Sequence, residues 1–274
     1  MTIRTTRGIV LHIAAHRESD KLVSLYSREL GRVTGIAKGA MNSARRFVNK
    51  LEEFSLLQVG YRPPRGQAGL LFLAEADLLR SHLALRQDYR RYVAAMYLCE
   101  LTLRFTREGD PDPGLFALLQ WALNSLDQGA PPVKTTVLFH LLLLSHAGYR
   151  PDLSRCATCR TEVGPDRTFT LLPGGGALLC SACQPLSSSR HRRLSVQTLK
   201  ILDSAQTASP EWLNRLRFPE RAAAEALEAL QQFSHHLLQQ DIHSWKAMRS
   251  CALERSSGNA RNHFPTQKTG MVHA

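Results

Sequence analysis

The chain has 274 residues, of which 43% are hydrophobic, and it carries a formal net charge of +12. No apolar run reaches the ~18–20 residues of a membrane span, and Met1 to Val10 lacks the pattern of a secretory signal. We therefore expect a cytoplasmic protein of two or three domains with no membrane partner. The positive charge is uneven, because residues 1–81 hold 13 Lys and Arg against 7 Asp and Glu. Localised positive charge of this kind indicates a polyanionic partner.

The first domain, residues 1–81, is predicted to contain five short strands. They lie at residues 9–13, 22–26, 33–37, 54–61 and 70–73, with no long helix between them. Such a series is typical of a small closed antiparallel barrel. The usual five-stranded barrel is the OB type, whose face and loops commonly hold oligonucleotides.

The stretch between the third and fourth strands is strongly basic. From Leu30 to Leu51 there are five basic residues and no acidic one. We interpret it as a groove that tracks a phosphate backbone, with Phe47 as a surface on which a base stacks. The alternative is a solvated loop with Phe47 in the core. The candidate DNA-binding residues here are Arg32, Lys38, Arg45, Arg46, Phe47 and Lys50.

Apolar residues then recur at helical spacing, which predicts a helical domain in two parts, residues 82–149 and 194–254. Pro131-Pro132 is expected to start one helix, Ser195 to lie near the start of another, and Pro219 to open a long one. Cys99 and Cys251 lie among apolar helical residues, so we expect them in the core. Residues 255–274 are basic and have little to bury, and we expect a disordered tail.

Four cysteines divide the two helical parts. Cys156 and Cys159 form one CxxC pair, and Cys180 and Cys183 form a second one. Two such pairs at this spacing predict a four-cysteine zinc ribbon over residues 150–193, with strands before and after Gly174-Gly175-Gly176. Four thiolates fill a tetrahedral shell, so one structural Zn²⁺ per chain is expected. The alternative is a set of reduced or redox-active thiols. The fold class is thus α+β and multidomain.

A short basic run closes the ribbon. Arg190, Arg192 and Arg193 are further candidate DNA contacts, either as an extension of the phosphate-binding surface or as a linker. No GxxxxGK[ST] phosphate loop and no GxGxxG after a strand is found, so ATP hydrolysis and an enzymatic role are not expected.

Several stretches resemble the bacterial RecO recombination mediators. They are Glu18-Ser19-Asp20-Lys21-Leu22, Gly31-Arg32-Val33, Ala37-Lys38-Gly39-Ala40, and the run from His146 to Leu153 before the first CxxC pair. The resemblance covers residues 1–190 in order.

The resemblance implies an OB-fold domain, a helical domain and a zinc ribbon in a non-enzymatic DNA-repair protein. It implies binding of single- and double-stranded DNA, annealing of complementary strands, and a nucleoid-associated location in the bacterial cytoplasm. The implied partners are RecR, the acidic C-terminal tail of the single-stranded-DNA-binding protein SSB, and RecA indirectly.

Three rival interpretations account for part of this sequence. His16-Arg17-Glu18 spells the H-x-E of zinc deaminases, but Arg155 rather than Pro precedes the first CxxC pair, and two cysteines would be left over. An RNA-binding or transcription-associated protein would use the same charge and fold. A structural adaptor would have no nucleic-acid role at all.

Overall fold

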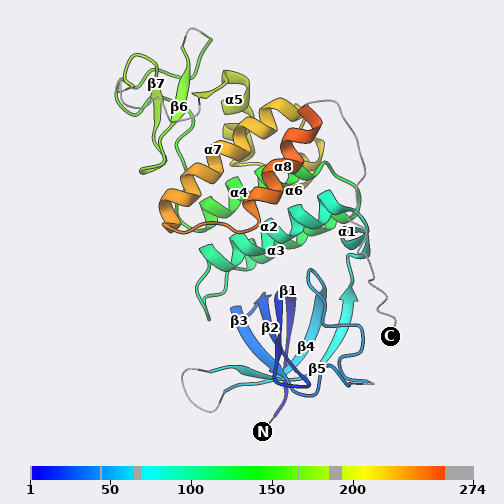
Figure 1. Ribbon diagram of the computed structural model, residues 1–274. Coiled ribbons are helices and arrows are strands. Elements are labelled where there is room, and N and C mark those ends of the chain that lie inside the picture. Colours follow the sequence, from blue (N-terminus) through cyan, green and yellow to red (C-terminus); the bar gives the residue numbers. More distant parts are fainter. Residues whose placement is uncertain (1, 44, 65–68, 166, 185–192, 257–274) are drawn as a thin grey trace, which may run out of the picture.

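The computed structural model describes residues 2–43, 45–64, 69–165, 167–184 and 193–256. Within them, a β-barrel is followed by a layer of α-helices, and a small sheet lies at the end of that layer remote from the barrel (Figure 1). The predicted fold class, a five-stranded amino-terminal barrel with helices and a four-cysteine cluster beyond it, is confirmed.

The barrel closes in the order β1-β2-β3-β5-β4. Its strands are β1 (Arg4–His16), β2 (Asp20–Ser27), β3 (Gly31–Ala37), β4 (Leu56–Arg62) and β5 (Leu71–Arg80). The expectation of purely antiparallel pairing is wrong at one seam, because β3 and β5 run parallel. The reason is geometric: a closed ring with an odd number of strands cannot alternate direction throughout.

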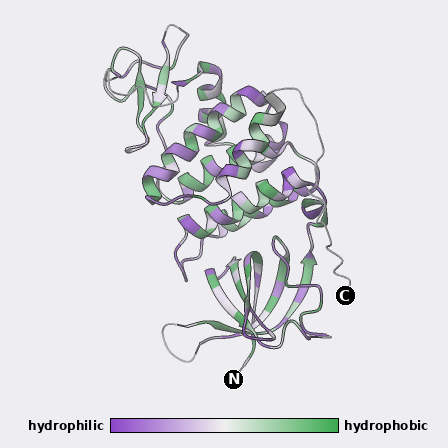
Figure 2. Ribbon diagram, in the orientation of Figure 1, coloured by the Kyte–Doolittle hydropathy of each residue, from purple (hydrophilic) through white to green (hydrophobic). Residues whose placement is uncertain are grey.

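Alternate residues of the strands fill the barrel, as the two-residue period of a strand requires. Figure 2 shows apolar and polar residues interleaved along these strands. Phe47 and Leu51, from the connection between β3 and β4, join the same core and plug it. The strand residues of this core are Val10, Val23, Leu25, Val33, Ala37, Leu57, Val59, Tyr61, Leu73 and Ala76.

The helical layer is built around α4 (Pro132–His146), which packs against α2, α3, α5 and α7. Nine of its residues are buried, so it is apolar on nearly every side, as a central helix must be. None of the described helices has both the length and the apolar composition to cross a membrane. The other helices are α1 (Leu83–Gln87), α2 (Tyr89–Phe105), α3 (Pro113–Asp127), α5 (Val196–Ala205), α6 (Pro210–Arg215), α7 (Glu220–Leu238) and α8 (Trp245–Ser256).

The helix starts follow the local chemistry that the sequence indicated. Pro132 is the first residue of α4, and Pro219 is the N-cap of α7. The Ser195 side chain caps α5 by accepting a hydrogen bond from the backbone N–H of Thr198. The thiols of Cys99 and Cys251 are buried, as expected.

The small sheet has the order β7-β6-β8, with β6 (Phe169–Leu171), β7 (Leu178–Cys180) and β8 (Arg193–Leu194). The β6–β7 hairpin was expected, but the third strand was not. Gly176 in its turn has a positive φ, and a Cβ there would meet the Phe233 ring of α7 at 2.9 Å. The turn therefore packs directly on the helical layer.

The loop between α2 and α3 makes one of the contacts between the barrel and the helical layer. Gly31, which opens β3, has φ +67, and a Cβ there would lie 2.2 Å from the carbonyl oxygen of Asp110. The next residue, Arg32, accepts a hydrogen bond from Gly109 N–H at 2.9 Å through its carbonyl oxygen. This junction therefore needs glycine at position 31 for two reasons, the backbone conformation and the close approach.

Replacing Gly31 by alanine should lower the free energy of unfolding by about 2–5 kcal/mol, because the strain of a left-handed residue adds to the clash with Asp110. Gly109→Ala is the matched control, since Gly109 has φ +75 but open space where its Cβ would be. The control should cost only the ~1–2 kcal/mol of the backbone strain. Urea unfolding measures both values, and equal losses would mean that the junction contact contributes nothing.

Candidate nucleic-acid interface and metal centre

Four cysteine sulfurs meet beside the small sheet. The Sγ atoms of Cys156, Cys159, Cys180 and Cys183 all lie within 4.8 Å of one another. The Sγ atoms of Cys159 and Cys180 are 3.6 Å apart. Sulfurs around a tetrahedral ion with bonds of ~2.3 Å are separated by about 3.8 Å. The cluster can therefore hold a metal ion with all four positions taken by protein, which suits a structural site.

The backbone shapes the two cysteine turns and joins them. Cys156 N–H donates to the carbonyl of Thr161 at 2.8 Å, which closes the first turn. Ala157 N–H donates to the carbonyl of Leu178 in β7 at 2.8 Å, and Cys180 N–H points at Cys156 Sγ at 3.4 Å. The hairpin thus carries the second pair back to the first.

The electrostatic surroundings favour the thiolate form of two of the four cysteines, Cys159 and Cys180. Hydrogen bonds from Thr161 lower the pKa of Cys159 to about 6. Burial acts to raise the pKa of Cys180, but a hydrogen bond from the Arg167 guanidinium, 3.4 Å from its Sγ, helps to lower this pKa overall. Hydrogen bonds with the sulfurs of Cys159 and Cys180 raise the pKa of Cys183 to about 12, so this thiol keeps its proton. A bound metal ion would displace that proton. Sequence reasoning missed Arg167, which no motif marks.

Three basic side chains lie exposed on the connection between β3 and β4. They are Lys38, Arg45 and Arg46, and we call them the cationic loop. Arg46 Nη2 donates to the carbonyl of Lys38 at 3.1 Å, so the two ends of the loop are adjacent. These three residues of the predicted DNA-binding set share one exposed surface.

Asp20 fixes the turn on which Lys38 sits. Its side chain is only 8% exposed, and Oδ1 accepts a hydrogen bond from Gly39 N–H at 2.8 Å. Met41 N–H donates to the carbonyl of Ser19 at 3.0 Å. The Glu18-Ser19-Asp20 stretch therefore anchors the cationic loop to the start of β2. The sequence alone showed that this stretch resembles the RecO mediators, but it did not show what the stretch does in the fold.

The proposed stacking role of Phe47 is contradicted. Its side chain is 3% exposed and belongs to the barrel core, and the Arg46 guanidinium lies 5.3 Å from its ring centroid. A base cannot reach a ring that is packed on one side and covered on another. The alternative that placed Phe47 in the core is the correct one, because the barrel end needs an apolar plug.

Arg32 lies away from the cationic loop, whereas Lys50 lies on the same connection as the loop but is paired with an acidic residue. Arg32 is at the other end of β3, where its Nη1 donates to the carbonyl of Leu103 at 2.8 Å. Lys50 Nζ is 3.3 Å from Asp77 Oδ1, so an acidic neighbour offsets its charge. The expected single stripe is therefore divided. The length of β3 sets the distance between Arg32 and Lys38, because five extended residues of the strand lie between them.

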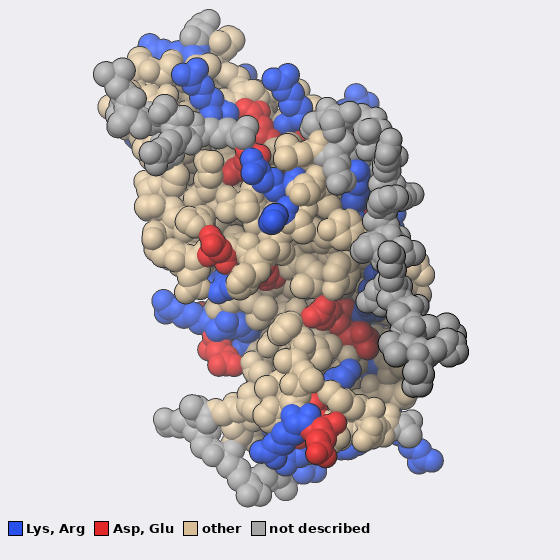
Figure 3. Space-filling model, viewed as in Figure 1, with Lys and Arg blue, Asp and Glu red and all other residues tan. Residues whose placement is uncertain are grey.

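The basic run after the second cysteine pair is described only in part. Arg190 and Arg192 lie outside the described residues, whereas Arg193 opens β8 with an exposed side chain. On the face shown in Figure 3, Lys and Arg gather over the small sheet and again where the barrel meets the helices. Acidic side chains accompany the basic ones at the junction of the barrel and the helices (Figure 3).

Comparison with known families decides the relationship of this chain. Residues 1–82 match the family model "Recombination protein O N terminal", and residues 86–246 match "Recombination protein O C terminal". The chain belongs to the RecO family. RecO is a family of DNA repair and recombination mediators, so the resemblance of the sequence motifs is confirmed.

Individual RecO relatives align with 65–90% of the chain. The DNA repair protein RecO of Syntrophobacter fumaroxidans is 30% identical over 248 residues, which are 90% of this chain and 98% of the relative. That of Anaeromyxobacter sp. strain Fw109-5 is 33% identical over 231 residues, or 84% and 90% of the two chains. The RecO protein of Geobacter metallireducens is 38% identical over 178 residues, or 65% and 71%.

Proposed function

We propose that this chain binds single- and double-stranded DNA without sequence preference and anneals complementary strands, acting as a non-enzymatic mediator. The observation that carries the proposal is the exposed cationic loop on a closed barrel in a chain of the RecO family. Strands and loops of OB-type barrels commonly hold oligonucleotides. The loop offers guanidinium and ammonium groups and no aromatic ring, which favours contact with phosphates over contact with bases.

The physical basis of annealing follows from this surface. Cations on the loop neutralise phosphates and release counterions, so affinity falls with salt and does not depend on sequence. A surface that screens two like-charged strands lowers the repulsion between them. Because it reads no base, Watson–Crick pairing alone selects the partner.

We further propose that the metal of the four-cysteine cluster is Zn²⁺. Four thiolates in a tetrahedral arrangement are the usual ligand set of structural zinc, and each is supplied by one of two CxxC turns. When bound, the ion ties the two turns together and so stabilises the small sheet. Arg167 would offset part of the negative charge that four thiolates leave on a divalent ion.

The proposal extends to partners and to the cell. RecR, the acidic tail of SSB and, indirectly, RecA are the proteins with which such a mediator would load strands, in the nucleoid of a bacterial cytoplasm. The domain limits at residues 81, 149, 193 and 254 are part of the same proposal. Its support is the family membership and the separation of barrel, helices and cysteine cluster along the chain.

Annealing of SSB-coated complementary strands is the decisive experiment. We expect the intact protein to accelerate annealing. We also expect binding of (dT)30 to weaken with salt, with three phosphates on the cationic loop contributing about −2 to the slope of log K against log[salt]. Fluorescence transfer between labelled strands and anisotropy titrations measure the two quantities, each with and without a zinc chelator. Unaccelerated annealing, or a preference for RNA of the same sequence, would contradict the proposal.

A further inference from the structure

A groove runs between the barrel and the helical layer. Its volume is about 580 Å³, within the usual range of ligand sites. β1 and β3 form one wall, and α2 with the connection between α7 and α8 forms the other. The floor is apolar and the rim is polar. The lining residues are Leu11, His12, Arg32, Met96, Glu100, Leu103, Arg104, His243 and Ser244.

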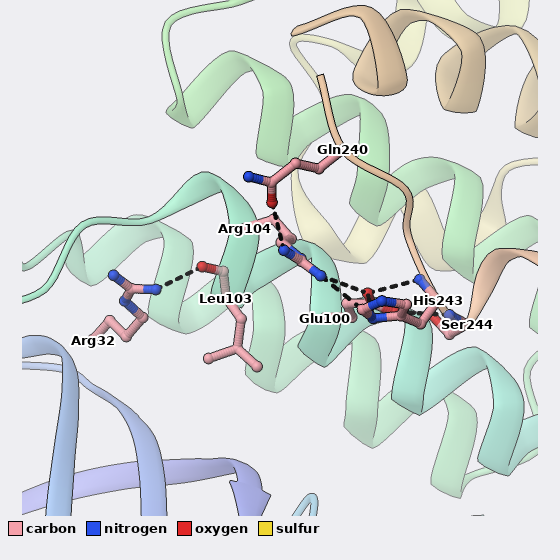
Figure 4. A network of polar contacts seen from close by, with 7 residues as sticks. All are labelled: Arg32, Glu100, Leu103, Arg104, Gln240, His243 and Ser244. Carbon is pink, nitrogen blue, oxygen red and sulfur yellow. Dashed lines mark hydrogen bonds and ion pairs between the residues drawn. The ribbon is translucent and has the colours of Figure 1, made fainter. Parts of the chain in front are cut away.

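Arg32 reaches into this groove from the end of β3. Its Nη1 donates to the carbonyl of Leu103, at 2.8 Å, whereas its buried Nε has no hydrogen-bond partner in the described part of the chain. A guanidinium carries five N–H donors, so this side chain retains donors for a ligand. Arg32 is the arginine that the barrel contributes to the groove (Figure 4).

Arg104 supplies a second guanidinium from the last turn of α2. Its Nη1 donates to Gln240 Oε1 at 2.7 Å, and its Nη2 lies 3.6 Å from Glu100 Oε1. Figure 4 shows Arg32 and Arg104 on either side of Leu103, one from the barrel and one from the helix. The two arginines thus face the groove from different elements.

Glu100 is the acidic residue among those that line the groove, and its oxygens are already engaged. They accept hydrogen bonds from His243 N–H, Ser244 N–H and Ser244 Oγ at 2.8, 2.8 and 2.6 Å. Burial acts to raise the pKa of Glu100, but these hydrogen bonds hold it below its usual value. The Glu100 carboxylate therefore binds the connection between α7 and α8. The groove is lined by two guanidiniums and one carboxylate.

The groove and the cationic loop lie at opposite ends of the outer face of β3. Burial alternates along β3 between the odd positions in the barrel core and the even positions outside it, from Arg32 to Ile36, and Lys38 continues the outer series. At ~3.3 Å per residue, Lys38 and Arg32 are about 20 Å apart along the strand. Ser24 of β2 lies beside Thr34 at the middle of this face.

We propose that a single strand of DNA runs from the cationic loop along the outer face of β2 and β3 into this groove, where Arg32 and Arg104 hold its sugar-phosphate chain. The inference rests on the proposed DNA binding and adds the path of the strand. The apolar lining residues Leu11, Met96 and Leu103 suit sugars and the faces of bases. Duplex DNA, with a persistence length of about 50 nm, does not bend into such a groove, whereas a single strand does. The groove therefore contributes to single-strand binding alone.

Arg104→Gln tests the path without touching the bond that joins Arg32 to the helical layer. We expect the affinity for (dT)30 at 50 mM salt to fall about 5–10-fold, and the salt slope to become shallower by about 0.7, because one phosphate contact is lost. Arg32→Gln should act in the same way, while binding of a 30-base-pair duplex should be unchanged in both. Arg221→Gln, which changes an exposed arginine at the start of α7, is the matched control.

The outcomes separate the groove from the proposed function. If (dT)30 binding is unchanged in Arg104→Gln and Arg32→Gln but falls in the cationic-loop variant, the single strand does not reach the groove. The inference is then wrong, and the proposed function is unaffected. Absence of binding by the intact protein would remove both. If a peptide of ten aspartates binds and only its affinity falls in Arg104→Gln, the groove is a peptide site and the inference is wrong.

Discussion

Lys38→Glu/Arg45→Glu/Arg46→Glu should lower the affinity for single-stranded DNA about 10²–10³-fold at 50 mM salt. Three phosphate contacts at a slope of ~0.7 each account for this range, and the introduced carboxylates add repulsion. Duplex binding and annealing should fall with it, because the cationic loop makes no distinction between the two forms. Filter binding over a salt series measures the effect, and the salt slope should become shallower by about 2.

The control for this variant has the same change of charge at another place. Arg215→Glu/Arg217→Glu/Arg221→Glu replaces three exposed arginines on and beside α6 and α7. It should retain affinity within a few-fold. The cationic-loop side chains are exposed, so the unfolding midpoint of the first variant should also stay near that of the unaltered chain. Equal losses of affinity in both variants would show that only total charge matters.

Cys180→Ser should abolish stoichiometric zinc binding and unfold the small sheet. Cys180 is fully buried, and structural zinc contributes an apparent ~10–16 kcal/mol to folding in zinc-finger peptides. Three remaining thiolates leave the ion open to chelators. We expect zinc per chain to fall from about one to near zero, and new protease cleavage sites to open between the two CxxC pairs, while the barrel and the helices keep their far-ultraviolet signal.

Cys251→Ser is the appropriate control, because Cys251 is a buried cysteine of α8 outside the cluster. It should retain one zinc per chain. Treatment of the unaltered chain with a chelator should reproduce the protease pattern of Cys180→Ser. A full zinc content in Cys180→Ser would mean that the cluster is not the metal site.

The local chemistry of the fold was readable from the sequence. The two-residue and 3.6-residue periods gave strands and helices, and prolines and Ser195 marked helix starts, because these signals act within a few residues. The cluster of four cysteines could also be predicted from the sequence, since two CxxC turns place four sulfurs around one point. The sequence also allowed the alternative in which Phe47 lies in the core.

Other features depend on which distant residues meet. The groove between the barrel and the helices has no sequence signature, because its residues come from elements that are far apart in the chain. The contact of Arg167 with the cysteine sulfurs has none either, because Arg167 is not part of the CxxC motifs. The third strand of the small sheet, β8, was missed for a similar reason: two residues are too few to show a period.

What the amino-acid sequence alone determined about this chain is its set of elements, its cluster of four cysteines and its excess of positive charge. Only the tertiary structure decided where that charge acts. Arg32 and Lys38 are six positions apart in the chain, and the sequence treats them as one basic stretch; an extended strand places them at opposite ends of the barrel. Phe47 stands beside Arg46 and is turned into the core. Side-chain direction follows from packing, and packing is set by residues that are remote in sequence.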